Sequence, residues 1–330
     1  MAAEEKANVQ DGLVYGYYLN GENKGVEIRS DQLPENLDSA DSMWLHFNYR
    51  HQMTQDWIRK QEVLGDFVVN ALLDEETRPR ASIMRNGVLI SLRGVNLNPG
   101  ADPEDMIAIR LWSDGKHIIS TRSRSSLSAR DIANLVCAKE GPETPGEFIA
   151  LLTELLISRM DDTIQSIEDQ VAEIEETILE TESYTLRSVI ANLRRQAISL
   201  RRYLAPQREA MLQLQNEKIS WFTASDRIHL RETNDRLTRY IEDIDSARDR
   251  AAVTQEELVN RLSEQLNSRM YVLSIVAAIF LPLGFLTGLL GINVGGIPGA
   301  DNPYAFAIFA IALVAIVALQ IWIFKVKRWF

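Results

Sequence analysis

The chain has 330 residues, of which 46% are apolar, and a formal net charge of −11. An acidic surface repels nucleic acid and attracts cations, so a DNA- or RNA-binding role is disfavoured and an ion-handling role is compatible with the composition. The single cysteine, Cys137, excludes an internal disulfide framework and fits a reducing cytosol.

The first 145 residues alternate strand and helix signals. Leu13–Leu19 and Met43–Phe47 are short, aromatic-rich and β-prone, and His51–Leu73 then has a broad apolar face at helical spacing. Asn-Gly at 86–87 and Asp-Gly at 114–115 each separate two β-prone runs, which predicts two hairpins. Together these signals predict a mixed α/β sheet domain.

A short helix and a break mark the end of this domain. Ser128 is a candidate cap for a helix that ends at Cys137, and the Gly- and Pro-containing stretch 141–146 follows it. We therefore expect a domain boundary at residue 145. The acidic N-terminus has neither an apolar h-region nor an Arg-rich amphipathic stretch, so no targeting segment is expected.

The next part of the chain, to about residue 268, is expected to be helical. Apolar residues recur at three- and four-residue spacing from Phe148 to Ile178, opposite an acidic face, which predicts one long amphipathic helix. Leu186–Leu214 carries many arginines, so we expect an antiparallel hairpin of an acidic and a basic helix, with a kink at Pro206. For the acidic run we favour a solvated face over a metal site.

A third helix is predicted from Ser225 to Gly291, roughly 100 Å long at about 1.5 Å per residue. Its first part carries apolar residues at seven-residue spacing, a packing seam typical of long helical stalks. The seam consists of Leu230, Leu237, Ile244, Ala251 and Leu258. Its simplest explanation is a coiled coil that holds subunits together.

Two uncharged apolar runs follow, Met270–Leu290 and Ala305–Phe324, and each has the roughly 20 residues that a membrane-spanning helix needs. Arg261 and Arg269 precede the pair and basic residues follow it in the tail 325–330, whereas the loop between the runs has no Lys or Arg. Because basic residues near span ends stay cytoplasmic, both termini are expected in the cytoplasm and the loop outside.

Polar and small residues form a row along one face of the third helix and into the first span. The row consists of Asn260, Ser263, Asn267, Met270, Ser274, Ala277, Leu281, Gly284 and Gly288. Gly284 and Gly288 alone indicate close helix packing without any pore. A row of water-compatible groups through the whole membrane favours an ion conduit. Because two spans cannot enclose a pore, several subunits would form a ring.

The segment Pro282-Leu-Gly-Phe-Leu-Thr-Gly-Leu-Leu-Gly-Ile-Asn293 resembles the first-span signature of the CorA superfamily of divalent-cation transporters, with Ile292 in place of the usual Met. Residues 291–299 resemble the variant of the ZntB zinc-transporter branch, and Leu204-Ala-Pro-Gln-Arg208 is similar to another recurrent stretch of the family. In domain order the resemblance covers nearly the whole chain.

The resemblance implies a funnel-shaped homopentamer in a bacterial inner membrane. Its cytosolic part would be an α/β/α domain with a mixed sheet, and a long helical stalk would continue into a pore-lining first span. The boundaries expected are 1–145 for the α/β domain, 146–222 for a helical hairpin, 223–269 for the cytosolic stalk, 270–291 for the first span, 292–304 for the external loop, 305–324 for the second span and 325–330 for a basic cytosolic tail. The activity implied is Zn²⁺ uptake coupled to protons.

By the same resemblance, Gly291, Ile292 and Asn293 would form the selectivity filter, in which Asn293 receives the hydrated ion. Leu273 joins the pore-facing row, with Met270 and Leu281 as candidate constrictions. A helix cap is the local alternative for Asn293. Asp301 is either a ring of charge at the external mouth or an ordinary loop aspartate. For coupling or cation attraction, the candidates nearest the membrane are Glu256, Glu257 and Glu264.

Ligand chemistry limits the zinc assignment. Sites that strip water from Zn²⁺ use thiolate, imidazole or carboxylate, and neither span contains Cys, His, Asp or Glu. The ion should therefore pass substantially hydrated, with modest selectivity over Cd²⁺, Ni²⁺ and Co²⁺. Of the four histidines, His46, His51, His117 and His229, none forms a pair at helical spacing, so ordinary domain residues are favoured over a zinc cluster.

The chain has no nucleophile and base pair and no phosphate-binding loop, so neither an enzyme nor a cofactor is expected. Two alternatives to zinc transport remain. One is a magnesium or cobalt channel of the CorA type, and the other, of a different class, is a membrane-anchored oligomeric sensor or scaffold whose hairpin serves only as an anchor.

Overall fold

The computed structural model describes residues 12–37, 41–75, 78–180, 185–291 and 302–327. The chain forms two compact units, Met1–Gln255 and Glu256–Phe330. The N-terminal unit thus continues past the break at residues 141–146, where the sequence suggested a boundary, and includes most of the helices that follow the sheet.

The described elements follow the predicted order of a sheet domain, then helices, then two apolar helices. They are β1 (Leu13–Tyr18), η2 (Ser30–Gln32), β2 (Met43–Asn48), α2 (Gln52–Lys60), η4 (Glu62–Leu64), α3 (Gly65–Leu73), β3 (Arg80–Met84), β4 (Gly87–Gly94), β5 (Ile107–Ser113), β6 (Ile118–Arg122), α4 (Leu127–Cys137), α5 (Pro145–Ser158), α6 (Asp161–Glu180), α7 (Thr185–Asn216), α8 (Ala224–Leu290) and α9 (Ala305–Val326).

The strands form one mixed sheet in the order β1-β2-β6-β5-β4-β3. The β2–β6 pair is parallel and the other neighbours are antiparallel, which confirms both the mixed sheet and the two hairpins, β3–β4 and β5–β6. In the second hairpin Gly115 has φ +94°, a left-handed conformation that favours glycine, so the Asp-Gly turn signal reflects a backbone requirement.

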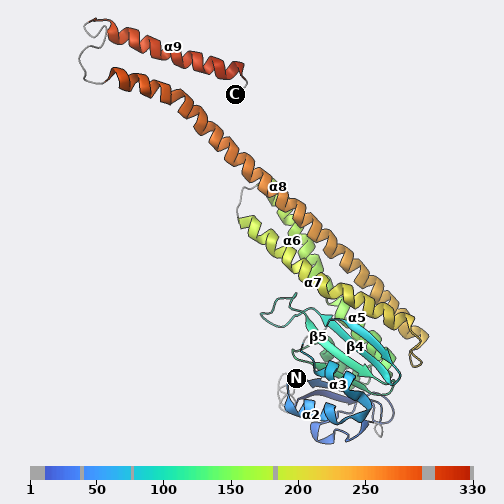
Figure 1. The fold of residues 1–330 in the computed structure, drawn as a ribbon. Coiled ribbons are helices and arrows are strands. Elements are labelled where there is room, and N and C mark those ends of the chain that lie inside the picture. Colours follow the sequence, from blue (N-terminus) through green and yellow to red (C-terminus); the bar gives the residue numbers. More distant parts are fainter. Residues whose placement is uncertain (1–11, 38–40, 76–77, 181–184, 292–301, 328–330) are drawn as a thin grey trace. The chain divides into compact units, whose positions relative to one another are not determined.

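Helices cover both faces of this sheet, as an α/β/α domain requires (Figure 1). On one face, Leu45, Leu89 and Ile119 pack with residues of α2 and α3 in one buried cluster. On the other face, side chains of β4 and β5 meet α5, and Phe148 packs against the Trp44 ring at 4.9 Å between centroids. Alternate strand residues therefore face two different cores, which explains why the strands are apolar almost throughout.

Three local expectations were wrong. The helix expected over His51–Leu73 is interrupted by η4, and its second half starts at Gly65, whose φ of +65° breaks the helical path. The cap of α4 is Ser126, which accepts a hydrogen bond from the Ala129 N–H, and not Ser128. The single helix expected from Phe148 to Ile178 is two helices, α5 and α6, because the chain turns at residues 159–160.

The apolar seam of α8 is buried within one chain. Leu230, Leu237, Ile244, Ala251 and Leu258 are each at most 2% exposed. The packing predicted for this seam is confirmed, but its partners belong to the same chain, so a coiled coil between subunits is not needed to explain it. Ion pairs also tie the neighbouring helices to α8, one from Arg201 of α7 to Asp245 and one from Glu175 of α6 to Arg250.

The C-terminal unit consists of the last part of α8 and of α9. Both helices contain a stretch long and apolar enough to cross a membrane, as the two apolar runs predict. Figure 1 shows α9 running back alongside the end of α8, and shows α8 bending in the part that contains Pro282. A proline inside a helix removes one backbone hydrogen bond, which accounts for the bend.

Candidate functional site

The residues predicted to line a pore all lie on α8 and are all exposed in the single chain. They are Asn260, Ser263, Asn267, Met270, Leu273, Ser274, Ala277, Leu281, Gly284 and Gly288. The large apolar members are no exception, since Met270, Leu273 and Leu281 expose 66%, 69% and 74% of their surfaces. We call this set the exposed row of α8.

The partly buried residues in the last part of α8 lie on the opposite side of the helix. Ile275, Ile279, Pro282, Leu283 and Leu286 are half-buried, and they follow one another at three- and four-residue spacing. At 3.6 residues per turn their mean direction is roughly half a turn away from the exposed row. α9 therefore covers the side of α8 that the row does not use.

The helix α9 contributes a complementary side to this contact. Phe309, Leu313, Ile316 and Gln320 are half-buried, again at three- and four-residue spacing. Gly284 is the one member of the exposed row that also borders an apolar groove between α8 and α9. The remaining faces of both helices are available to lipid or to other copies of the chain.

The glycines do not mediate a contact between α8 and α9. A side chain built at Gly284 or Gly288 would meet no atom of the described chain within 4 Å. Close helix packing through this Gly-xxx-Gly pair, the alternative to a pore, therefore has no partner within the described part of the chain.

The predicted filter lies at and beyond the end of α8. Gly291 is exposed, and its N–H donates to the Thr287 carbonyl at 2.9 Å, so the helical hydrogen bonding continues up to this residue. Ile292, Asn293 and Asp301 lie outside the described residues. The filter and the mouth therefore stay predictions from the sequence.

The acidic residues proposed for coupling or cation attraction lie on α8, shortly before the first apolar run begins at Met270. Glu256, Glu257 and Glu264 are all exposed, and Glu257 pairs with Arg261 one turn later at 2.9 Å. An exposed pair of this kind contributes little to stability. Glu256 and Glu264 are the better candidates to attract a cation, since no ion pair is found for them among the described residues.

No group of three or more potential metal ligands of the His, Cys, Asp and Glu types occurs in the described ranges. His46 is buried in the sheet, where its Nδ1 lies 2.7 Å from the Ser120 hydroxyl, and His117 pairs with Asp114 at 2.8 Å in the β5–β6 turn. These contacts explain both histidines as parts of the fold, as the sequence suggested.

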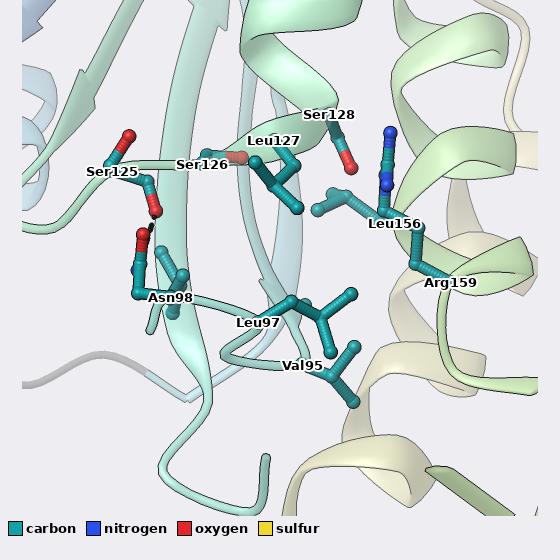
Figure 2. Close-up of a pocket in the computed structure, with 11 residues that line it drawn as sticks. Val95, Leu97, Asn98, Ser125, Ser126, Leu127, Ser128, Leu156 and Arg159 are labelled. Carbon is teal, nitrogen blue, oxygen red and sulfur yellow. Dashed lines mark hydrogen bonds between the residues drawn. The ribbon is translucent and has the colours of Figure 1, made fainter. Parts of the chain in front are cut away.

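A small pocket in the N-terminal unit lies where the end of β4 meets α4 and α5 (Figure 2). Leu156 forms part of its apolar wall. Two of its polar side chains are bonded within the chain: Asn98 donates to the Ser125 carbonyl at 3.1 Å and Arg159 pairs with Asp131. We assign no ligand to this pocket.

Sequence reasoning missed one polar residue of the second span. Gln320 on α9 is the only Asn or Gln in the two apolar runs, and its amide nitrogen donates to the Ala278 carbonyl of α8 at 3.4 Å. The signal was present in the sequence, because an amide is unusual in a span that otherwise looks like a lipid-facing wall.

The sequence model of the family described as "CorA-like Mg2+ transporter protein" matches residues 39–328 of the chain. This chain belongs to the CorA family. Family membership confirms the expectation drawn from Pro282–Asn293. It identifies the protein as an ion transporter of the inner membrane and not as an enzyme, and it removes the alternative in which the hairpin is only an anchor.

Individual CorA-family proteins match over nearly their full length. The divalent cation transporter CmaX of Pseudomonas aeruginosa is 40% identical over 96% of this chain and 97% of its own. The zinc transport protein ZntB of Yersinia enterocolitica is 34% identical over 98% of both chains. The structure of full-length CmaX superposes with a TM-score of 0.81 over 97% of this chain and 98% of that one. The fold expected for the CorA family is therefore confirmed.

Proposed function

We propose that this protein carries Zn²⁺ into the cell across the bacterial inner membrane, as a homopentamer with both termini in the cytoplasm. In this proposal the exposed row of α8 lines a central pore, and Gly291, Ile292 and Asn293 form its external entrance. Asp301 would add negative charge at the mouth, and Glu256, Glu257 and Glu264 would attract the ion on the inner side or take part in proton coupling.

The observation that carries the proposal is the division of α8 into two faces. Its half-buried side is apolar and packs against α9, whereas the exposed row, in which polar and small residues are interspersed with Met270, Leu273 and Leu281, lies on the other side. In a span surrounded only by lipid, Ser274, Ala277 and Gly284 would have no reason to share a face. In a ring of copies the same face would meet water and the ion.

Zinc is favoured over other divalent ions by relatives named ZntB, which match the chain from end to end. The ligand chemistry still requires a hydrated ion, because the spans offer only hydroxyl, amide and backbone oxygens. We therefore expect Cd²⁺, Ni²⁺ and Co²⁺ to compete with Zn²⁺.

The second candidate ion is Mg²⁺. The family description names Mg²⁺, and the relative CmaX is described only as a divalent cation transporter. A hydrated Mg²⁺ would use the same oxygen-lined path, since this ion gives up its water reluctantly. Competition between Mg²⁺ and Zn²⁺ in one assay distinguishes the two candidates.

The test is Zn²⁺ uptake by liposomes that contain the purified protein and a zinc-sensitive dye. We expect Asn293→Ala to lower the initial rate by about tenfold, equivalent to about 1.4 kcal/mol, because it removes the ring of amide oxygens at the entrance. The matched control is Asn302→Ala, in the same loop, whose side-chain oxygen accepts a hydrogen bond from the Tyr304 N–H.

Equal rates for the wild type and Asn293→Ala would overturn the assignment of the entrance. Absence of any divalent flux from well-assembled wild-type protein would overturn the proposed function as a whole. The same liposomes with and without a pH gradient test proton coupling, because uptake that ignores the gradient is not coupled to protons.

A further inference from the structure

Pro282 leaves one backbone carbonyl of α8 without its helical partner. It lies inside α8 and has no N–H, so the carbonyl four residues earlier, that of Ala278, lacks the N–H donor that an α-helix normally provides for it. Both residues lie within the first apolar run, where water is not available to replace the missing donor. Such a carbonyl needs a donor from a side chain or from another helix.

Gln320 of α9 supplies that donor. Its Nε2 lies 3.4 Å from the Ala278 oxygen, at the residue where the helical bond is missing. The hydroxyls of Ser274 and Thr287, which also lie in the first run, donate to carbonyls of their own turns, namely those of Met270, Leu283 and Gly284. Gln320 is the only carboxamide in either run, so its position opposite the proline break is specific.

The other end of the same amide is buried without a partner. Gln320 Oε1 is shielded from solvent and has no hydrogen-bond donor within the described part of the chain. A half-satisfied amide at membrane depth is unfavourable, so packing alone does not explain its presence. The hydrogen bond from Gln320 to the Ala278 carbonyl explains why an amide occurs at this position.

The bond is long for a hydrogen bond, which has consequences for movement. Donor–acceptor distances for N–H···O bonds are typically about 2.7–3.2 Å, so a small displacement of α8 against α9 strengthens or breaks this one. The segment of α8 beyond Pro282 carries Gly284 and Gly288, and Gly291 follows its last residue. The direction of that segment depends on how the break at Pro282 is held.

We propose that Gln320 is a positioning residue for transport. It bridges from α9 to the Ala278 carbonyl and so sets the angle between the two parts of α8 on either side of Pro282. The inference rests on the proposed function, in which the segment after Pro282 lines the pore and leads to its entrance. Gln320 touches no ion and acts through the backbone of α8.

A double-mutant cycle tests this proposal in the full-length protein. Gln320→Met keeps the volume and removes the donor, and Pro282→Ala returns an N–H to the Ala278 carbonyl. We expect Gln320→Met to lower the maximal rate of Zn²⁺ uptake roughly threefold, in keeping with the strength of side-chain bonds between membrane helices. We expect no effect of Gln320→Met in the Pro282→Ala background, where the carbonyl has its helical partner again.

Two comparisons separate positioning from a purely structural role. The KM for Zn²⁺ should stay unchanged in Gln320→Met, because the entrance is intact. Thr287→Val, which removes a hydroxyl bonded within α8, should change the rate by the same factor in both backgrounds. Gln320→Asn, whose amide is one methylene shorter, should behave like Gln320→Met and provides a second variant if the first does not assemble.

The proposal is overturned if Gln320→Met lowers the uptake rate by the same factor in the wild-type and Pro282→Ala backgrounds. It is also overturned if Gln320→Met has no effect in the wild-type background, where Pro282 is present. The melting temperatures of the same four proteins in detergent provide a second cycle that needs no transport. If the wild type carries no divalent ion, the proposed function fails. The melting cycle then decides whether Gln320 bonds the Ala278 carbonyl.

Discussion

The buried amide of Gln207 joins the helical layer to the sheet. Its Oε1 accepts a hydrogen bond from the Arg93 backbone N–H of β4 at 2.7 Å, and its side chain is 1% exposed. The β3–β4 ladder ends at the pair Arg80 and Ser91, so the Arg93 N–H lies beyond the reach of strand β3. Gln207 thus replaces a strand partner at the point where the sheet stops.

We expect Gln207→Leu to lower the free energy of unfolding by about 1–3 kcal/mol, because it leaves a buried N–H without an acceptor. Gln213→Leu, the same change at an exposed position of the same helix, is the control and should have little effect. Urea unfolding of the full-length protein in detergent measures both. Equal losses for the two variants would contradict the role of Gln207.

His46 is a second buried polar residue with a defined consequence. Burial, and to a lesser degree the positive charge of Arg122, hold the pKa of His46 well below its usual value. Trp44 Nε1 donates to the Ser120 oxygen at 2.8 Å, and His46 Nδ1 lies 2.7 Å from the same oxygen. The ring is therefore neutral in the folded protein.

Stability should fall as the pH drops below about 6.5, the ordinary value for histidine, because the unfolded chain then binds a proton that folded His46 does not. The slope from this one group is at most about 1.4 kcal/mol per pH unit, and above about pH 6.5 it contributes none. Unfolding measured from pH 5 to 8 should show a smaller slope for His46→Gln than for the wild type. The exposed His229→Gln is the control, and a slope unchanged in His46→Gln would contradict the prediction.

The long helix α8 packs against different parts of the chain along its length. From Leu230 to Ala251, in the N-terminal unit, its apolar seam is buried within the same chain, and in the C-terminal unit one side packs on α9. Both contacts use residues at helical spacing, so the sequence pattern predicts them well. The pattern alone could not tell whether the seam's partner is the same chain or another, since burial looks the same in either case.

The exposed row of α8 can be tested with cysteine substitutions after Cys137→Ser has removed the chain's single thiol. We expect a positively charged, water-soluble thiol reagent to block Zn²⁺ uptake through Ala277→Cys, which lies on the row. Ala315→Cys, an exposed position of α9 on the side away from α8, should not respond because lipid surrounds it. Block of the Ala315 variant alone would place the ion path elsewhere.

The single chain cannot form a complete ion conduit. Its two membrane helices cannot enclose a pore, and the exposed row of α8 has no partner within the described part of the chain. In a closed ring of identical subunits, symmetry directs the exposed row of every copy toward one common axis. The proposed number of five comes from the resemblance to the CorA superfamily.

Native mass spectrometry of the protein in mild detergent should therefore give a complex with five times the chain mass of 37.4 kDa. The interface between membrane helices is expected to depend on small residues such as Gly288, so Gly288→Leu should reduce the fraction of the complex. Leu319→Val, an exposed position of α9, is the control. A monomer as the main species under conditions that retain flux would contradict the ring.

Features that depend on local pattern and composition could be predicted from the amino-acid sequence. The two spans, the long helix from Ala224 to Leu290, both hairpins and the two faces of α8 follow from apolar spacing and turn residues, which act within a few residues of each other. The same is true of the family, since its signature lies in one contiguous stretch that ends at Asn293.

Features that depend on which distant segments meet became known from the three-dimensional fold. The turn between α5 and α6 and the burial of the Leu230–Leu258 seam within one chain result from packing between residues far apart in sequence. The bond from Gln320 to the carbonyl that Pro282 leaves free is of the same kind. Each half of that contact is visible in the sequence, but only the antiparallel packing of α9 on α8 brings the two together.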